Sequence, residues 1–273
     1  MESKSACCPA ITPTIYLSAN MTARFYYPGS LSSGQMMVLP MNISHHAIRV
    51  LRLKQGDTLI LFNGRGGEFS GSIEHIDKSN CTVRLSKFHE VERESPLTIH
   101  LVQAVCVNEK MDWIIQKSVE LGVSHIQPVT ANRSVVRLSE ARAHKRRLHW
   151  QQIAIAACEQ CGRNHVPELL PLQSISEWFS QQLTNKPKNT KCKLAYRFML
   201  SASANKRLTE YPSPAREDSI TLLIGPEGGF TDEEEKAAFS IGFMPVRLGP
   251  RILRTESAGL VAIAAAQTLW GDY

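Results

Sequence analysis

The alternation of apolar and polar positions divides the chain into two parts with different structural periods. From Arg24 to about Glu94, segments such as "GDTLILFNGRGGEFSGSIEHI" and "CTVRLSKFHE" alternate apolar and polar residues around glycine turns, which is the pattern of short β-strands. One helix, predicted over "SHHAIRVLRL", interrupts these strands. The first part is therefore predicted to form a small β-barrel, and "RESPLT" after it to form a linker.

Beyond this linker, buried strands alternate with helices. "IHLVQAVCV" is predicted to be a strand, and "KMDWIIQKSVELG" an amphipathic helix that ends at Gly122. Further strands are predicted at "HIQPVT", "KLAYRFML", "ITLLIG" and "MPVRLG", and helices near Glu140–Cys161, Ser174–Leu183, Thr231–Ile241 and Thr255–Leu269. Such alternation is typical of an α/β domain with a parallel sheet. Asn185–Lys193 and Ser201–Asp218 are predicted to be loops.

Length and composition limit the architecture further. At 273 residues and 43% hydrophobic, the chain is long enough for two domains, which we place at residues 21–94 and 95–273. Residues 1–20 lack the basic start and long apolar centre of a secretory signal, and we expect them to be a disordered leader. No apolar run approaches the roughly 20 residues that span a bilayer, so no membrane contact is expected.

The cysteines favour a reducing compartment. Their number, seven, is odd, which suggests no disulfide framework and makes the cytoplasm the expected location. Cys158 and Cys161 have C-x-x-C spacing with His165 nearby, but a zinc site would normally need a second ligand pair. We expect no metal and interpret the pair as small buried residues on a helix, with redox or metal use as the alternative.

Most of the net charge of +6 lies in one segment. Residues 131–166 hold seven cations against two acids, a difference of +5, namely Arg133, Arg137, Arg142, Lys145, Arg146, Arg147 and Arg163 against Glu140 and Glu159. A clustered basic surface favours a polyanion such as nucleic acid. The alternative is a solvated helix face.

The stretch "LLIGPEGGFTDEEE", residues 222–235, has the pattern of a strand, a turn and a helix start. Thr231 and Glu234 form a predicted capping box, and the adjacent Gly228 and Gly229 allow close approach of a ligand. The stretch lacks both the Walker lysine and the G-x-G-x-x-G spacing. Because its four acidic residues would repel a phosphate, a neutral or cationic adenosyl ligand fits better. The alternative is a plain tight turn.

A second glycine turn, in "RLGPRILRTESAGLVAIAAAQTLWGDY", follows the last predicted strand. Since ligands in open α/β sheets bind at the carboxyl ends of strands, the two glycine loops are expected to line one pocket.

These paired motifs carry a specific resemblance. "LLIGPEGGFT" followed by "LGPRILRTESA" resembles the 16S ribosomal RNA uridine-N3 methyltransferases, the small-subunit methyltransferase E family of the SPOUT class. The similarity extends through "EKMDWIIQKSVELGV", "IAIAACEQCGRNHVPE", "HAIRVLRLKQGD" and "ARFYYPG", and covers essentially everything after Met21. Ser257 replaces a threonine of many relatives, and Tyr196–Asp218 matches the family pattern poorly.

The resemblance implies a fold, a reaction and partners. The fold is a SPOUT-type parallel sheet with a C-terminal trefoil knot, preceded by a PUA-like barrel that binds RNA. The implied reaction transfers a methyl group from S-adenosyl-L-methionine to uridine N3 in the decoding region of 16S rRNA, within the small ribosomal subunit. A homodimer formed through the knotted domains is also implied.

Site residues follow from motif position. Cofactor contacts, mostly through backbone groups and apolar walls, are implied for Leu223, Ile224, Gly225, Pro226, Glu227, Gly228, Leu248, Gly249, Ile252, Leu253 and Arg254. Glu256 and Glu227 are the candidate catalytic acceptors of the N3 proton, and Arg254 is the candidate that stabilises charge on the uracil oxygens. A helix-capping glutamate and an acid-paired arginine are the alternatives.

Candidate RNA contacts are Arg24, Arg49, Arg52 and Arg163, because arginines hold phosphates. Phe25 and Tyr26 beside Arg24 either stack on bases or belong to the barrel core. Two other functions stay open: an RNA-binding assembly factor without chemistry, disfavoured by the intact glycine motifs, and a nucleotide-dependent oxidoreductase, disfavoured by the missing fingerprint.

Overall fold

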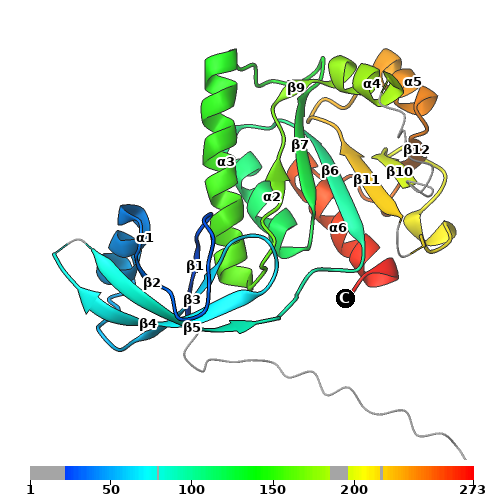
Figure 1. Cartoon of the computed structure of the whole chain (residues 1–273). Coiled ribbons are helices and arrows are strands. Elements are labelled where there is room, and N and C mark those ends of the chain that lie inside the picture. The colour runs from blue at the N-terminus through cyan, green and yellow to red at the C-terminus, as the bar shows by residue number, and fades with distance from the viewer. Residues whose placement is uncertain (1–21, 79, 185–195, 216–217) are drawn as a thin grey trace, which may run out of the picture.

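The computed structural model describes residues 22–78, 80–184, 196–215 and 218–273. The predicted leader 1–20 and the predicted loop 185–193 lie outside these residues. Figure 1 shows an N-terminal unit beside a larger unit that contains the rest of the chain.

The N-terminal unit is built on a five-stranded sheet of order β1-β3-β4-β5-β2. Its elements are β1 (Ala23–Tyr26), β2 (Met36–Val38), α1 (Met41–His45) with a following π-helical turn (His46–Val50), β3 (Thr58–Phe62), β4 (Glu68–Ile76) and β5 (Cys81–His89). β1 runs parallel to β3, and the other neighbours are antiparallel. Among the described residues, β1 and β2 are the two edges of the sheet and do not pair with each other. The backbone hydrogen bonds of these strands therefore do not close the sheet into the predicted barrel.

Alternating side chains of these strands form a separate apolar core. Phe25, Leu59, Leu61, Val83 and Leu85 are at most 1% exposed and pack together. The period-two pattern of the sequence predicts this because successive residues of a strand point to opposite faces. Phe25 therefore belongs to the core and does not present a stacking surface.

The larger unit contains a seven-stranded sheet with the path β12-β10-β11-β6-β7-β8, and β9 also pairs with β7. Its strands are β6 (Thr98–Ala104), β7 (His125–Thr130), β8 (Glu168–Leu169), β9 (Gln173–Ser174), β10 (Tyr196–Leu200), β11 (Ser219–Ile224) and β12 (Met244–Val246). Every pairing in it is parallel, as the sequence predicted. β8 and β9 were not predicted, because two residues are too few to show an alternation of apolar and polar positions.

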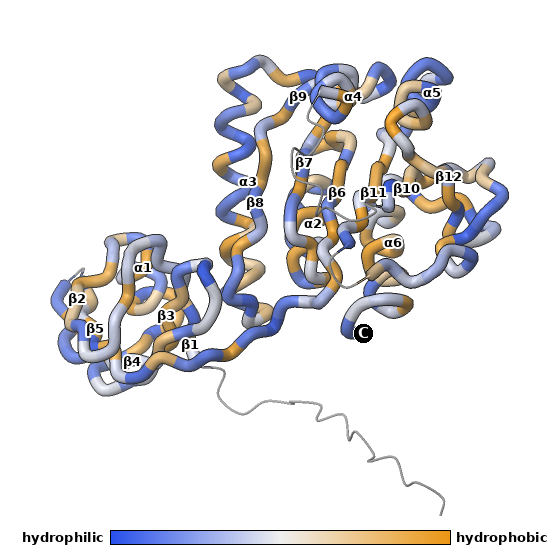
Figure 2. The backbone as a smooth tube through the Cα atoms, turned by 45° about the vertical axis from the view of Figure 1, so that its right-hand side comes forward, coloured by the Kyte–Doolittle hydropathy of each residue, from blue (hydrophilic) through white to orange (hydrophobic). Residues whose placement is uncertain are grey.

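Helices cover both faces of this sheet (Figures 1 and 2). They are α2 (Asn108–Glu120), α3 (Glu140–Cys161), α4 (Ile175–Thr184), α5 (Asp232–Ser240) and α6 (Thr255–Trp270), with a short 3-10 turn at Leu208–Glu210. Residues of α2, α3 and α6 share one apolar core, and residues of α4 and α5 share the other. The unit is thus a three-layer α/β structure.

The helix start at Thr231 has the predicted capping box. The Glu234 N–H donates to Thr231 Oγ1 at 3.3 Å, and the Thr231 N–H donates to Glu234 Oε2 at 2.8 Å. Glu234 also accepts from the Asn132 N–H at 2.8 Å. This carboxylate therefore joins the start of α5 to the loop after β7.

Candidate active site

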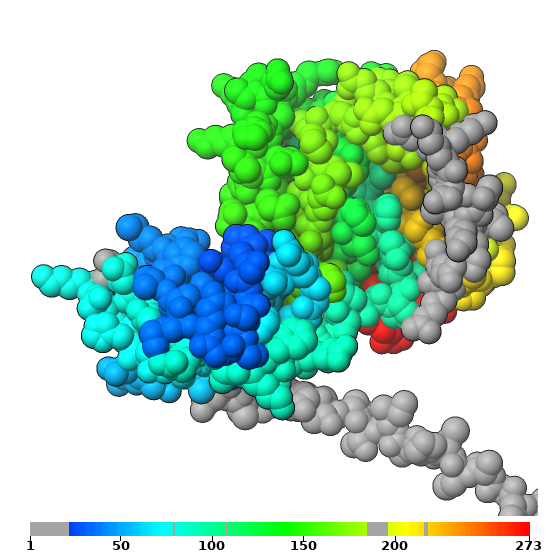
Figure 3. All heavy atoms as spheres, in the orientation of Figure 1, coloured from blue at the N-terminus to red at the C-terminus, as the bar shows by residue number. Residues whose placement is uncertain are grey.

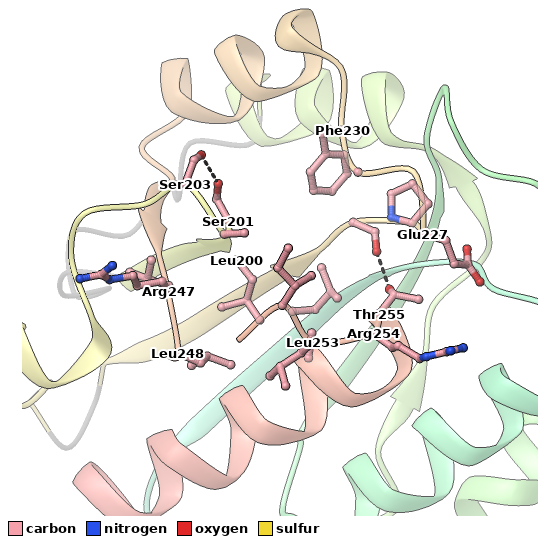
Figure 4. Close-up of a pocket in the computed structure, with 18 of the residues that line it drawn as sticks. Leu200, Ser201, Ser203, Glu227, Phe230, Arg247, Leu248, Leu253, Arg254 and Thr255 are labelled. Carbon is pink, nitrogen blue, oxygen red and sulfur yellow. Dashed lines mark hydrogen bonds between the residues drawn. The ribbon is translucent and has the colours of Figure 1, made fainter. Parts of the chain in front are cut away.

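A cavity of about 630 Å³ lies where β10, β11 and β12 end (Figure 4). Three segments after these strands supply most of its wall: Leu200–Ser203, Ile224–Glu227 with Gly229 and Phe230, and Val246–Gly249 with Arg251–Glu256. Its size lies within the roughly 300–1,000 Å³ of small-molecule sites. The two glycine loops of the sequence therefore line one pocket, as expected for the carboxyl edge of a parallel sheet.

Thr255, the first residue of α6, connects the two loops. Its hydroxyl donates to the Gly225 carbonyl oxygen at 2.5 Å, the bond drawn as a dashed line beside Thr255 in Figure 4. The Gln103 Nε2 donates to the same hydroxyl oxygen at 3.4 Å. Thr255 is 7% exposed and Gln103 is fully buried, whereas Gly225 is partly exposed, so the connection is shielded from water on the side of Thr255 and Gln103.

Most of the predicted cofactor residues line this cavity. They are Ile224, Gly225, Pro226, Glu227, Leu248, Gly249, Ile252, Leu253 and Arg254. An added Cβ at Gly249 would meet no heavy atom of the described chain within 4 Å, so this glycine leaves open space. Gly225 is different, because an added Cβ would lie 3.2 Å from the Phe230 ring.

Leu223 and Gly228 are not part of the cavity wall formed by the described residues. Leu223 points away because side chains alternate along β11: Leu222 and Ile224 enter one core, and Leu223 enters the other. Gly228 faces Arg133 instead, with an added Cβ only 3.1 Å from the Arg133 Cβ. Arg133 donates to the Gly228 and Phe230 carbonyl oxygens and so supports the loop from outside.

The predicted set did not include several lining residues, namely Lys110, Leu200, Ser201, Ala202, Ser203, Gly229, Phe230, Glu235, Val246, Arg247, Arg251, Thr255 and Ala258. The segment 200–203 lies in the stretch that resembled the family least. The sequence feature that could have identified Lys110 is its position in the first turn of α2. A cation there is unfavourable next to the helix dipole, and a nearby carboxylate offsets this.

Lys110 brings the two candidate catalytic glutamates together. Its Nζ lies 3.4 Å from Glu227 Oε1 and 3.2 Å from Glu256 Oε2. The hydrogen bond of Glu256 to its own backbone N–H at the start of α6 lowers the pKa of its carboxyl, and Lys110 adds to this, although burial opposes it. Glu256 is therefore held in its charged form.

Arg254 occupies the N-cap position of α6, makes no capping hydrogen bond with its side chain, and is exposed. Figure 4 shows Arg254 and Glu227 on the same side of the cavity. Together with Lys110 and Glu256, they form a charged rim on one side of a pocket that both apolar and polar residues line.

The predicted RNA residues fall into two classes. Arg49 and Arg52 are exposed on the N-terminal unit, and Arg52 has φ 57°, the one positive φ at a non-glycine position in the described chain. Arg24 and Arg163 are committed to contacts inside the protein. The Arg24 side chain is 11% exposed and pairs with Glu68, and Arg163 is 4% exposed and pairs with Glu94.

The basic residues around α3 are mostly available to solvent. Arg133, Arg137, Arg142 and Lys145 are exposed, and Arg146 and Arg147 are partly so. Cys158, in contrast, is fully buried in the larger core and donates to the His165 carbonyl oxygen at 3.6 Å. This supports the interpretation of Cys158 as a packing residue, whereas Cys161 is only partly buried.

Comparison with known proteins agrees with this geometry. The model of an RNA methyltransferase domain matches residues 93–267, and that of an RNA methyltransferase PUA domain matches residues 40–86. The chain belongs to the RNA methyltransferase family of ribosomal RNA small subunit methyltransferase E. The family member of that name from Buchnera aphidicola subsp. Schizaphis graminum is 36% identical over 91% of this chain and 97% of its own. The member from Bacillus subtilis is 32% identical over 81% and 85%.

Two solved structures of similar proteins contain S-adenosyl methionine. The ribosomal RNA small subunit methyltransferase E of Neisseria gonorrhoeae, bound to S-adenosyl methionine, has a TM-score of 0.82 and 40% identity over 92% of this chain and 99% of its own. A methyltransferase from Legionella pneumophila, also in complex with this cofactor, has a TM-score of 0.83 and the same identity and coverage. Within the described residues, no helix has the length and apolar character needed to cross a membrane.

Proposed function

We propose that this member of the family methylates N3 of a uridine in the decoding region of 16S rRNA, with S-adenosyl-L-methionine as methyl donor. The observation that carries the proposal is the pocket that the two glycine loops line, together with the Thr255–Gly225 hydrogen bond that joins these loops. Family membership and the cofactor in two similar structures support it.

The described residues fit this cofactor. The cavity is large enough, its wall includes apolar side chains and the two glycine loops, and the open space at Gly249 allows close approach. Ile224, Leu248 and Leu253 would provide the apolar walls. When bound, the sulfonium supplies an activated methyl group, so the protein has to align the uridine and manage its N3 proton.

The charged rim suits this second task. Lys110 holds Glu227 and Glu256 at one side of the cavity, where either carboxylate would accept the proton. Lys110 and Arg254 would stabilise negative charge on the uracil oxygens as N3 loses its proton. Because the pKa of Glu256 is lowered, its carboxylate carries no proton at neutral pH, and the same shift makes it a weaker base.

Access to N3 requires an unpaired or extruded base, because this atom lies on the Watson–Crick edge. Arg49 and Arg52 on the N-terminal unit, and the exposed basic residues around α3, would hold the phosphates. We place the boundary between the RNA-binding and catalytic domains at residue 94, supported by the separate core of the N-terminal unit.

A homodimer, a trefoil knot and a cytoplasmic location complete the proposal. The knot is inferred from the family alone. The dimer has support in exposed apolar residues of α2 and α6, two helices that pack together: Trp113 is 51% exposed, Val261 42% and Leu269 40%. Ile252, at 86% exposed, lies just before α6.

The direct test supplies cofactor with a labelled methyl group to purified protein and to three RNA substrates. Naked 16S rRNA, small ribosomal subunits and 23S rRNA would be taken from cells that lack the modification. We expect label in 16S rRNA, and comparison of the first two substrates shows which is preferred. Cofactor binding without label in any RNA would favour an assembly factor instead.

A further inference from the structure

The N-terminal unit contacts the larger unit at the C-terminal end of α3. Figure 3 shows the blue and cyan N-terminal residues against the lower end of α3, with the upper part of that helix not covered by them. β1 packs beside α3, and the Tyr26 N–H donates to Glu159 Oε1 at 2.9 Å. Phe62 of β3 is fully buried in the core of the larger unit.

Glu68 is the centre of a buried charged network at this contact. It is 5% exposed and accepts hydrogen bonds from Arg24 at 2.5 Å, Arg93 at 3.2 Å and Asn164 at 3.2 Å. Burial disfavours its charge, but these donors outweigh burial and keep the pKa of Glu68 below its usual range.

The donors to Glu68 come from both sides of the contact. Arg24 also donates to Asn164 Oδ1 at 2.7 Å and to the Gly162 carbonyl oxygen at 3.2 Å. Arg93 donates to the same carbonyl at 2.9 Å, and Asn164 donates to the Val91 carbonyl oxygen at 2.9 Å. Thus β1, β4, the segment before β6 and the end of α3 meet at one carboxylate.

Arg163 continues the network on the side of the larger unit. It pairs with Glu94 and donates to the Val119 and Val123 carbonyl oxygens. The chain therefore crosses from one unit to the other between Arg93, which contacts Glu68, and Glu94, which contacts Arg163.

A network of this type has a larger effect on the relative orientation of the two units than on the free energy of unfolding. Buried ion pairs often contribute little net free energy, because desolvation offsets their attraction. Each donor here has a fixed direction, and a changed angle between the units would leave buried charges unpaired, which is costly. The network therefore favours one relative orientation of the two units.

We infer that Glu68 is a positioning residue for the methyl transfer: it fixes the orientation of the RNA-binding unit relative to the cofactor pocket, which it does not touch. This inference rests on the proposed function, since it assigns RNA placement to the N-terminal unit. It also assigns Arg24 and Arg163 to the contact between the units, in place of the predicted RNA contacts.

The test compares Glu68→Gln with Glu74→Gln in the full-length protein. Glu74 lies on the same strand and pairs with Arg84 at an exposed site, with 39% of its side chain accessible, so its substitution is the matched control. Three quantities are measured: the stoichiometry and affinity of S-adenosylmethionine binding, kcat on small subunits per cofactor-binding site, and amide hydrogen exchange of residues 90–95 and 162–165.

We expect Glu68→Gln to bind the cofactor within about twofold of the unchanged protein and to lose about 100-fold in kcat, because small misplacement of reactants has effects of that size. Exchange in both segments should be faster, and Glu74→Gln should change none of these quantities. Arg93→Gln, which removes a partly exposed donor from Glu68, should change them in the same direction and decides the matter if Glu68→Gln does not fold.

Native kcat per binding site in the folded variants, or unchanged exchange, would overturn the inference. So would a loss of cofactor binding in proportion to activity, since that would make Glu68 a folding residue only. If the unchanged protein transfers no methyl group to RNA, the proposed function fails, and the exchange contrast between Glu68→Gln and Glu74→Gln alone decides whether the network fixes the orientation.

Discussion

At the scale of single residues, Thr255 has the widest influence on the pocket. Its hydroxyl connects Gly225 of one loop to the start of α6 and accepts from Gln103 of β6. Loss of this hydroxyl would leave the Gly225 carbonyl unpaired. The shape of the pocket depends on this bond because its two walls belong to segments that are separated by 30 residues of sequence.

Replacement of Thr255 by valine keeps the shape of the side chain and removes the hydroxyl. An unpaired buried acceptor costs about 1–3 kcal/mol, and we expect roughly a tenfold weaker affinity for S-adenosylmethionine. Isothermal titration calorimetry measures this change. Thr255→Ser keeps the hydroxyl and is the control, with affinity within about twofold of the original. Equal affinity of the serine and valine variants would show that the bond has no role.

Gly249 tests the position of the cofactor. Because an added Cβ would meet no heavy atom of the described chain within 4 Å, Gly249→Val should leave the melting temperature almost unchanged. Its side chain would occupy space at the pocket wall and should weaken cofactor binding by about tenfold or more. A thermal melt and a titration of the same sample measure both effects. Unchanged affinity would contradict the assignment of Gly249.

At the scale of elements, the sequence predicted those features that depend on interactions between neighbouring residues. The capping box at Thr231 and the ends of α3 at Glu140 and Cys161 follow from neighbouring residues, and the structure confirms them. The parallel sheet follows from the alternation of strands and helices. The alternation along β11 also predicts that the Leu223 side chain points into the core, so any contact of this residue with the cofactor would be through its backbone.

Side-chain contacts between residues far apart in the chain could not be predicted from the sequence. Arg24 meets Glu68 across 44 residues and Asn164 across 140, so nothing near Arg24 distinguishes it from the exposed Arg49. The same holds for Arg163 and Glu94, which are 69 residues apart. Charge predicts an affinity for phosphate, but only the tertiary fold determines which guanidinium groups stay accessible.

The proposed dimer is tested at α6. Val261 is exposed on a helix that is otherwise apolar along much of its length, as the colouring in Figure 2 shows. A charged residue in an apolar interface is unfavourable, so Val261→Arg should sediment as a monomer in analytical ultracentrifugation at concentrations where the unchanged protein is dimeric. Met41→Arg, at a residue 74% exposed on the N-terminal unit, is the control and should remain dimeric. An unchanged dimer in Val261→Arg would exclude α6 from the interface.

At the scale of the whole molecule, the two units have complementary properties. The N-terminal unit and α3 present accessible cations, and the far end of the sheet holds the cofactor-sized pocket with its charged rim. The network around Glu68 connects them. The account therefore requires this protein to bind RNA through one unit, to hold the methyl donor in the other, and to place a single uridine beside that donor.

The identity of the methylated nucleoside tests this account most directly. 16S rRNA in small subunits from cells without the modification is incubated with the protein and S-adenosylmethionine, digested to nucleosides, and analysed by liquid chromatography and mass spectrometry against standards. The account predicts one new product, N3-methyluridine, whose yield falls by about tenfold when the Gly249→Val variant is used at low cofactor concentration. A methyl group at C5 or on the ribose 2′-oxygen, on a base other than uracil, or on no nucleoside at all would contradict it.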